Sequence, residues 1–113
     1  MQTLLPTLLS EGVHRRRLSL LRTAQVIAEA PARLLGLAPK GRIAPGLDAD
    51  VALVDPAREW TLTRDALQTR SGISPYVGRI FTGAVVVTLV RGRVVYRDGE
   101  FPIAPGHGRF VRP

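Results

Sequence analysis

Residues 31–55, PARLLGLAPKGRIAPGLDADVALVD, constrain the fold of this chain more than any other segment. Pro31 suits the first turn of a short helix, and Gly36 is the residue type that most often ends one. A lysine–glycine turn at Lys40 and a proline–glycine turn at Pro45 follow. The segment closes with Val-Ala-Leu-Val, which is apolar on both faces and predicts a buried strand. The chain therefore changes from helices to strands near Lys40.

The residues before this segment have the periodicity of helices. A leucine pair repeats within residues 4–9 at helical spacing, and Gly12 ends the apolar stripe. Ser19 is the predicted N-cap of a second helix, although Arg22 stands where a capping box has an acidic or amide residue. The expected apolar face of this helix consists of Leu20, Leu21, Ala24, Ile27 and Ala28.

The second half of the chain has the periodicity of strands. We expect the buried strand at residues 51–54 to end at Asp55, and a short second strand to follow at residues 60–62. Thr63 is a candidate cap for a helical turn. The glycine and proline in residues 71–78 indicate a loop.

The strongest strand candidate is residues 84–90, which are almost wholly apolar. A turn at Arg91 and Gly92 leads back into a strand at residues 94–96. Because Arg is a poor first residue for a two-residue type I′ turn, we expect a type I turn with Gly92 in a bulge position. Proline and glycine predict a surface loop in residues 102–113.

Composition limits the possible partners. The chain has 16 basic and 9 acidic residues, a net charge of +7, which is compatible with nucleic-acid binding. The basic residues are mostly dispersed arginines, and the one tight run, residues 15–17, has no interleaved aromatics, so we do not expect nucleic acid as a partner. The apolar run at residues 4–9 is too short to span a membrane and lacks the layout of a signal peptide. We therefore expect a cytoplasmic protein without membrane attachment.

No catalytic arrangement stands out in the sequence. Cys is absent, which excludes disulfides and cysteine metal sites. His14 and His107 lie far apart without neighbouring ligands, so we predict surface loop residues. There is no G-x-S-x-G motif, and the glycines at 36 and 41 are not followed by the Lys-Ser/Thr of a phosphate loop. We predict no catalytic, cofactor-binding or metal-ligating residue here, and interpret three aspartates as turn residues: Asp48, Asp50 and Asp55.

The sequence nevertheless resembles the metal-dependent cyclic amidohydrolases, the group of dihydroorotase, dihydropyrimidinase and allantoinase. The motifs that carry the resemblance are QTLLP at residues 2–6, SEGV at 10–13, PARLLGL at 31–37 and KGRIAPG-x-DAD at 40–50. This family commonly has Asn where the chain has Ala30. Two later motifs look most like allantoinase, SPYVGR at residues 74–79 and FPIAP at residues 101–105, and dihydroorotase follows closely.

The resemblance implies that the chain is an α+β fragment. Residues 1–37 would be terminal helices of an amidohydrolase barrel, residues 38–101 a partial β-sandwich, and residues 102–113 a tail. The parent would combine a distorted (β/α)8 barrel, which takes about 250 residues, with the small β-sandwich. It would carry a divalent metal pair, usually zinc, whose ligands lie upstream of the segment that Gln2 matches.

Several interpretations remain open at this point. In the first, the chain is the structural C-terminal portion of an allantoinase-like hydrolase of cyclic amides or ureides and is inactive alone. A dihydroorotase or dihydropyrimidinase segment is the alternative of the same class. A non-catalytic binding or assembly module, or a basic nucleic-acid-binding domain, would belong to another class. The expected partners are the missing barrel part or another copy in a homo-oligomer, and the helices, lacking barrel strands, should be loosely docked.

Overall fold

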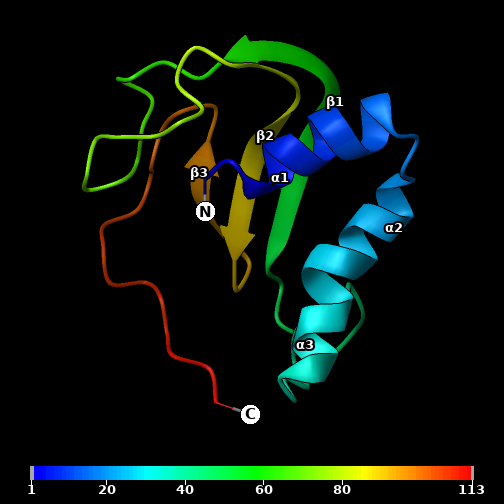
Figure 1. The fold of residues 1–113 in the computed structure, drawn as a ribbon. Coiled ribbons are helices and arrows are strands. Elements are labelled where there is room, and N and C mark those ends of the chain that lie inside the picture. The colour runs from blue at the N-terminus through cyan, green and yellow to red at the C-terminus, as the bar shows by residue number, and fades with distance from the viewer. Residues whose placement is uncertain (1, 113) are drawn as a thin grey trace.

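A computed structural model, which describes residues 2–112, shows two helical segments beside an antiparallel sheet (Figure 1). The first helical segment is α1 (Leu4–Thr7) continued by the π-helical η1 (Leu8–Arg15). The second is α2 (Leu20–Ala24), the π-helical η2 (Gln25–Glu29) and α3 (Ala30–Leu34). The three strands β1 (Val51–Thr61), β2 (Ile80–Val90) and β3 (Arg93–Arg97) lie in the order β1-β2-β3. Helices and an antiparallel sheet in separate parts of the chain agree with the α+β prediction.

The second helical segment is continuous, where the sequence predicted a separate third helix starting at Pro31. Ser19 is its N-cap as predicted, and its hydroxyl oxygen accepts the Arg22 N–H at 3.1 Å. Pro31 lacks an N–H and crowds the preceding turn, which would break a regular α-helix. The π-helical turn widens the helix immediately before it, with the Ala30 N–H donating to the Gln25 carbonyl. The helix therefore passes through Pro31.

Gly36 ends this helix, as the sequence predicted. Its φ is +67°, in the left-handed region that favours glycine. The Gly36 N–H donates to the Arg33 carbonyl at 3.3 Å, and the Leu37 N–H to the Ala32 carbonyl at 2.8 Å. These two bonds form a Schellman motif, which satisfies carbonyls at the helix end.

Strand β1 differs from the prediction in two ways. It does not end at Asp55, because a bulge of residues 56–58 opposite Gly83 carries the pairing onward. The Asp55 carboxylate accepts the N–H groups of Ala57 and Arg58 and so stabilises the bulge. The expected burial of residues 51–54 is also wrong in this structure. β1 is an edge strand, and Leu53 is 50% exposed.

The β2–β3 turn is a two-residue turn, closed by the pairing of Val90 with Arg93. Both central residues have positive φ, +47° at Arg91 and +75° at Gly92, which is the type I′ pattern. The predicted type I turn with a glycine bulge is therefore wrong. Two contacts stabilise this turn. The Asp50 carboxylate accepts the Arg91 N–H, and the Ala49 carbonyl accepts the Gly92 N–H. The predicted helical turn after Thr63 is a simple turn instead.

The core lies where the first helical segment crosses β2 (Figure 1). Leu9 is 1% exposed, and Leu62 and Phe81 are fully buried. A Cβ on Gly83 would lie 2.7 Å from the Leu9 Cβ, so only glycine permits this close approach. The first helical segment thus packs closely on the sheet at this point. Within residues 2–112, no helix has both the length and the apolar character needed to cross a membrane.

Candidate functional site

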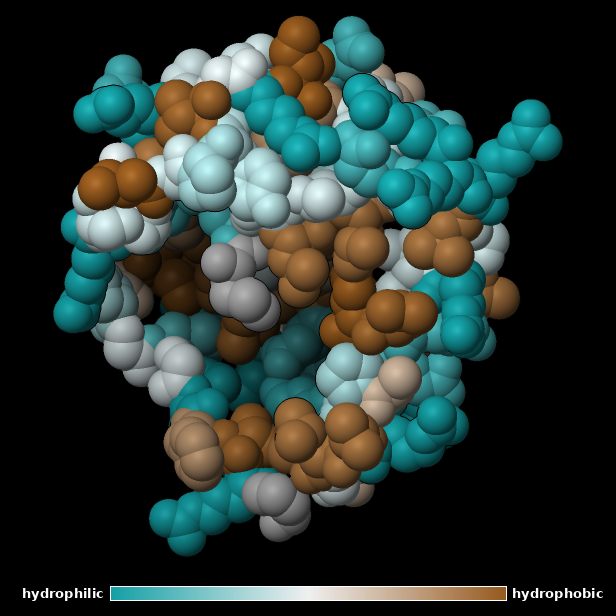
Figure 2. All heavy atoms as spheres, viewed as in Figure 1, coloured by the Kyte–Doolittle hydropathy of each residue, from teal (hydrophilic) through white to brown (hydrophobic). Residues whose placement is uncertain are grey.

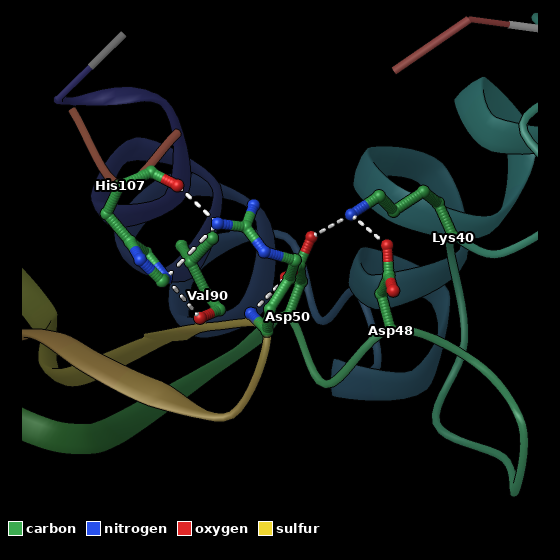
Figure 3. Close-up of polar contacts among 6 residues, drawn as sticks. Lys40, Asp48, Asp50, Val90 and His107 are labelled. Atoms are coloured by element: carbon green, nitrogen blue, oxygen red, sulfur yellow. Dashed lines mark hydrogen bonds and ion pairs between the residues drawn. The ribbon is translucent and has the colours of Figure 1, made fainter. Parts of the chain in front are cut away.

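The densest group of charged side chains joins three distant parts of the chain (Figure 3). Lys40, Asp48 and Asp50 come from the connection between α3 and β1, Arg91 from the β2–β3 turn, and His107 from the C-terminal tail. We call these five residues the polar cluster. The sequence placed Lys40, Arg91 and the aspartates in turns and His107 in a surface loop, and it did not indicate that they meet.

Lys40 lies between the two aspartates. Its Nζ is 2.7 Å from Asp48 Oδ2 and also forms an ion pair with Asp50. Hydrogen bonds to Asp48 and Asp50 raise the pKa of Lys40 above its ordinary value of 10.5. Partial burial alone raises the pKa of Asp50, but hydrogen bonds from Lys40 and from the Arg91 backbone outweigh it and lower the pKa below 3.8. Lys40 and Asp50 are therefore both held in their charged forms.

The other half of the polar cluster attaches the tail to the turn. Asp50 Oδ1 accepts the Arg91 N–H at 2.7 Å, and the Arg91 guanidinium donates to the His107 carbonyl. His107 Nε2 lies 3.0 Å from the Val90 carbonyl and 3.5 Å from Arg91 Nη2. A carbonyl can only accept, so the shorter contact requires a proton on Nε2, and Nε2 then cannot accept from Arg91. His107 is a half-buried structural donor in this arrangement.

The contacts of the polar cluster hold separate parts of the chain together. Its carboxylates and its imidazole Nε2 bind neighbouring groups of the chain. Across residues 2–112, no group of three or more His, Cys, Asp or Glu side chains could hold a metal ion. The described residues thus do not fit the metal that the family resemblance implies. His14 is exposed as predicted but lies in η1 rather than in a loop, and its Nε2 is 2.7 Å from the Pro56 carbonyl.

A second polar contact connects the first helical segment to the loop before β2. Arg79 of the SPYVGR motif forms an ion pair with Glu11 of η1. Its guanidinium carbon lies 5.7 Å from the centre of the Tyr76 ring and 5.4 Å from that of Phe81, so it also makes cation–π contacts. Part of the motif that most resembles allantoinase therefore positions a helix on the sheet.

An apolar groove runs between the second helical segment, the 37–43 connection and the start of β1, with a volume of about 720 Å³. The whole predicted apolar face of this helix lines it. Figure 2 shows apolar side chains that remain at the surface of the molecule. The strongly exposed members of the lining are Leu20, Leu21, Leu35 and Ile43. Lys40, Asp48 and Asp50 of the polar cluster also contribute to its lining.

Known proteins similar to this chain belong to one family. Residues 1–95 match the Amidohydrolase family. The chain is 51% identical over 112 residues to an allantoinase of Rubrobacter xylanophilus, which covers 99% of the chain and 24% of that protein. It is 42% identical to a dihydroorotase of Methanothermobacter thermautotrophicus over 96% of the chain and 24% of that protein.

The fold also matches a solved structure. An L-hydantoinase (dihydropyrimidinase) from Arthrobacter aurescens superposes with a TM-score of 0.90 at 38% identity, over 96% of the chain and 24% of that structure. The chain therefore spans about a quarter of the length of the relatives that it matches.

Proposed function

Since the chain belongs to the amidohydrolase family, we propose that it is the C-terminal structural portion of an allantoinase-like hydrolase of cyclic amides or ureides. The observation that carries this proposal is the match to an allantoinase over 99% of the chain but only 24% of that relative. The SPYVGR motif supports allantoin as the ring that the parent opens. By itself the chain has no hydrolytic activity in this proposal.

In such a parent, the chain would support the part of the enzyme that carries out the hydrolysis. The family generally depends on a metal, and residues 2–112 offer no group that could bind one, so the metal would be held by other parts of the parent. The Glu11–Arg79 pair fixes the first helical segment on the sheet, and the polar cluster fixes the connection, the turn and the tail. Through these contacts the chain would support the fold of the parent, and it would not supply a reacting group. The homo-oligomeric state and cytoplasmic location inferred from the sequence stay predictions.

A dihydroorotase is the second candidate for the parent. The 42% identity to the Methanothermobacter thermautotrophicus dihydroorotase extends over 96% of the chain. Allantoinase comes first because its identity is higher, at 51%. Both candidates assign the same structural role to the chain and differ only in the ring that the parent opens.

A chimera tests the proposal directly. The 112 matching residues of the Rubrobacter xylanophilus allantoinase are replaced by this chain, and the hydrolysis of allantoin and of dihydroorotate is measured. We expect kcat/KM on allantoin to stay within about tenfold of the intact enzyme, a transition-state cost of about 1.4 kcal/mol. The same replacement in the Methanothermobacter thermautotrophicus dihydroorotase tests the second candidate, which a higher retained activity there would favour. A folded chimera without activity on either ring would contradict the proposal, as would hydrolysis by the chain alone.

A further inference from the structure

Strand β3 forms one edge of the sheet, and the outer backbone groups of such a strand are a template for a further strand. The chain turns back beside β3 through Asp98 and Gly99 (Figure 1). Arg97 and Glu100 then exchange two backbone hydrogen bonds, at 2.9 Å and 2.8 Å, and form an antiparallel bridge. The tail thus begins as a fourth strand would.

Across residues 101–112, no further bridge to β3 follows. In the register of the first bridge Phe101 lies opposite Tyr96, and the centres of their rings are 5.5 Å apart in an edge-on contact. The next exchange of backbone hydrogen bonds would join Val95 to Pro102, but proline has no N–H to donate. Val95 is also the extra residue of a bulge between β2 and β3. The tail therefore separates from the strand at Pro102.

The tail returns to the sheet at the other end of β3. His107 Nε2 donates to the Val90 carbonyl at 3.0 Å, and the Arg91 guanidinium donates to the His107 carbonyl. Between these two attachments, the tail and β3 enclose a cleft of about 590 Å³. Both sides contribute to its lining, which includes Arg93, Val94, Arg97, Glu100, Pro102 and Ile103. We call residues 98–107, which cross the open edge of β3, the strap.

We propose that the strap protects the open edge of β3 from pairing with a strand of another molecule, and that His107 holds the strap in place. Natural proteins protect sheet edges with prolines, bulges and covering loops, and this edge combines all three. Beyond His107, Phe110 is 88% exposed and does not anchor the tail by burial. Release of His107 would let the strap move away and would leave β3 free to pair. The strap is independent of the ring that the parent opens.

Cysteine labelling tests whether His107 holds the strap, since the chain has no Cys of its own. Ile103→Cys places the probe in the strap, where the native side chain is half-buried and lines the cleft. We expect His107→Ala to raise the rate of maleimide labelling there by about threefold or more, because a released segment opens more often. His14→Ala is the matched control, since its Nε2 also contacts a backbone carbonyl, away from the strap. A Phe110→Cys probe, already exposed, should be labelled equally in all backgrounds.

Light scattering tests whether the strap protects the edge. The comparison is made at low ionic strength and about pH 8, where histidine is neutral, with Leu21→Asp in every variant to reduce association through the apolar groove. His107→Ala should raise the apparent mass above that of His14→Ala and of Leu21→Asp alone. All three have the same net charge at this pH, so the repulsion between copies is matched. Association through the β1 edge contributes equally to each of them.

A further variant, His107→Gln, separates the hydrogen bond from a general loss of stability. Its side-chain amide can still donate to the Val90 carbonyl, so labelling and apparent mass should stay close to those of the wild type. Unchanged labelling of Ile103→Cys in His107→Ala would show that His107 does not hold the strap. Faster labelling without added mass would show that the strap does not protect the edge. Unfolding of His107→Ala in circular dichroism would place His107 in the folded core and would also overturn the inference.

Discussion

At the scale of single residues, the charges of the polar cluster hold separate segments rather than a ligand. Lys40 is central, since its ammonium group contacts both Asp48 and Asp50. Asp50 in turn accepts the Arg91 N–H, and this contact stabilises a positive φ that Arg adopts only at a cost. Loss of the lysine charge would therefore weaken both the helix-to-sheet connection and the turn.

We expect Lys40→Met to lower the free energy of unfolding by about 1–2 kcal/mol at neutral pH, because the charge pairs are partly exposed. The lowered pKa of Asp50 means that its contribution is present above pH 3.8 and is lost as the pH falls through the folded-state value. The raised pKa of Lys40 means that its contribution is present below pH 10.5 and is lost as the pH rises through the folded-state value.

The difference between wild type and Lys40→Met should therefore be largest between these two pH limits and shrink outside them. Urea unfolding at several pH values measures it. Arg112→Met removes a basic charge from the exposed tail and serves as the control for net charge. A difference between wild type and Lys40→Met that is the same at about pH 3 and at about pH 7 would contradict the assignment.

At the scale of elements, Gly41 determines how the second helical segment meets the connection that follows it. Its φ is +93°, and a Cβ there would lie 2.6 Å from the Ala32 Cβ and 3.0 Å from the Ala28 carbonyl oxygen. The helix can approach the Lys40–Gly41 turn only because this position has no side chain. The floor of the apolar groove depends on this contact.

Gly41→Ala should consequently destabilise the chain more than Gly46→Ala. Both glycines have positive φ, but nothing lies within 4 Å of a Cβ on Gly46, so this variant isolates the backbone strain. We expect the free energy of unfolding to fall by about 1–3 kcal/mol more for Gly41→Ala, because a methyl group is forced into an occupied space. Equal losses in urea unfolding would show that the helix moves away without cost.

The sequence correctly predicted features that depend only on residues close by in the chain. Ser19 and Gly36 set the limits of the second helix by hydrogen bonds to neighbouring backbone groups, and both were predictable. Two features were predicted wrongly. The helix continues through Pro31 because a π-helical turn precedes it, and Arg91 adopts a positive φ in a turn that a contact with Asp50 stabilises. The polar cluster could not be predicted, since its members are brought together from residues 40 to 107 only by the fold.

Strand β1 shows the same limit at the level of pairing. Its apolar residues predicted a strand buried on both faces, whereas the described residues place it at an edge with exposed side chains. The pattern of apolar residues indicates which faces of a strand are suited to burial. It does not indicate which other segment would cover them. Leu53, which the sequence predicted to be buried, is half exposed at this edge.

At the scale of the whole molecule, two opposing forces act between copies of the chain. The exposed apolar face and the open strand edges favour association, whereas the charge of +7 opposes it. Salt screens the charge over about 10 Å at 0.1 M and leaves the apolar attraction in place. The isolated chain should therefore self-associate, and more strongly as salt is added.

Light scattering at tens of micromolar tests this expectation across a salt series. The apparent mass should rise with ionic strength, and Leu21→Asp should reduce the rise because it places a charge on the apolar face. Ile73→Asp adds the same charge outside the groove and should reduce it less. A monomer at every salt concentration would show that the exposed leucines are not attractive enough to matter.

The open face of the second helical segment also has a consequence for biosynthesis. If this chain is the last quarter of a longer protein, its leucines leave the ribosome after the surface that covers them has already been made. At about 5–20 residues per second, 113 residues take on the order of 10 s to translate. The apolar face would then be exposed to chaperones and proteases only for that short interval. Synthesised without the rest, the same face would stay exposed for the lifetime of the molecule, and rapid turnover would follow.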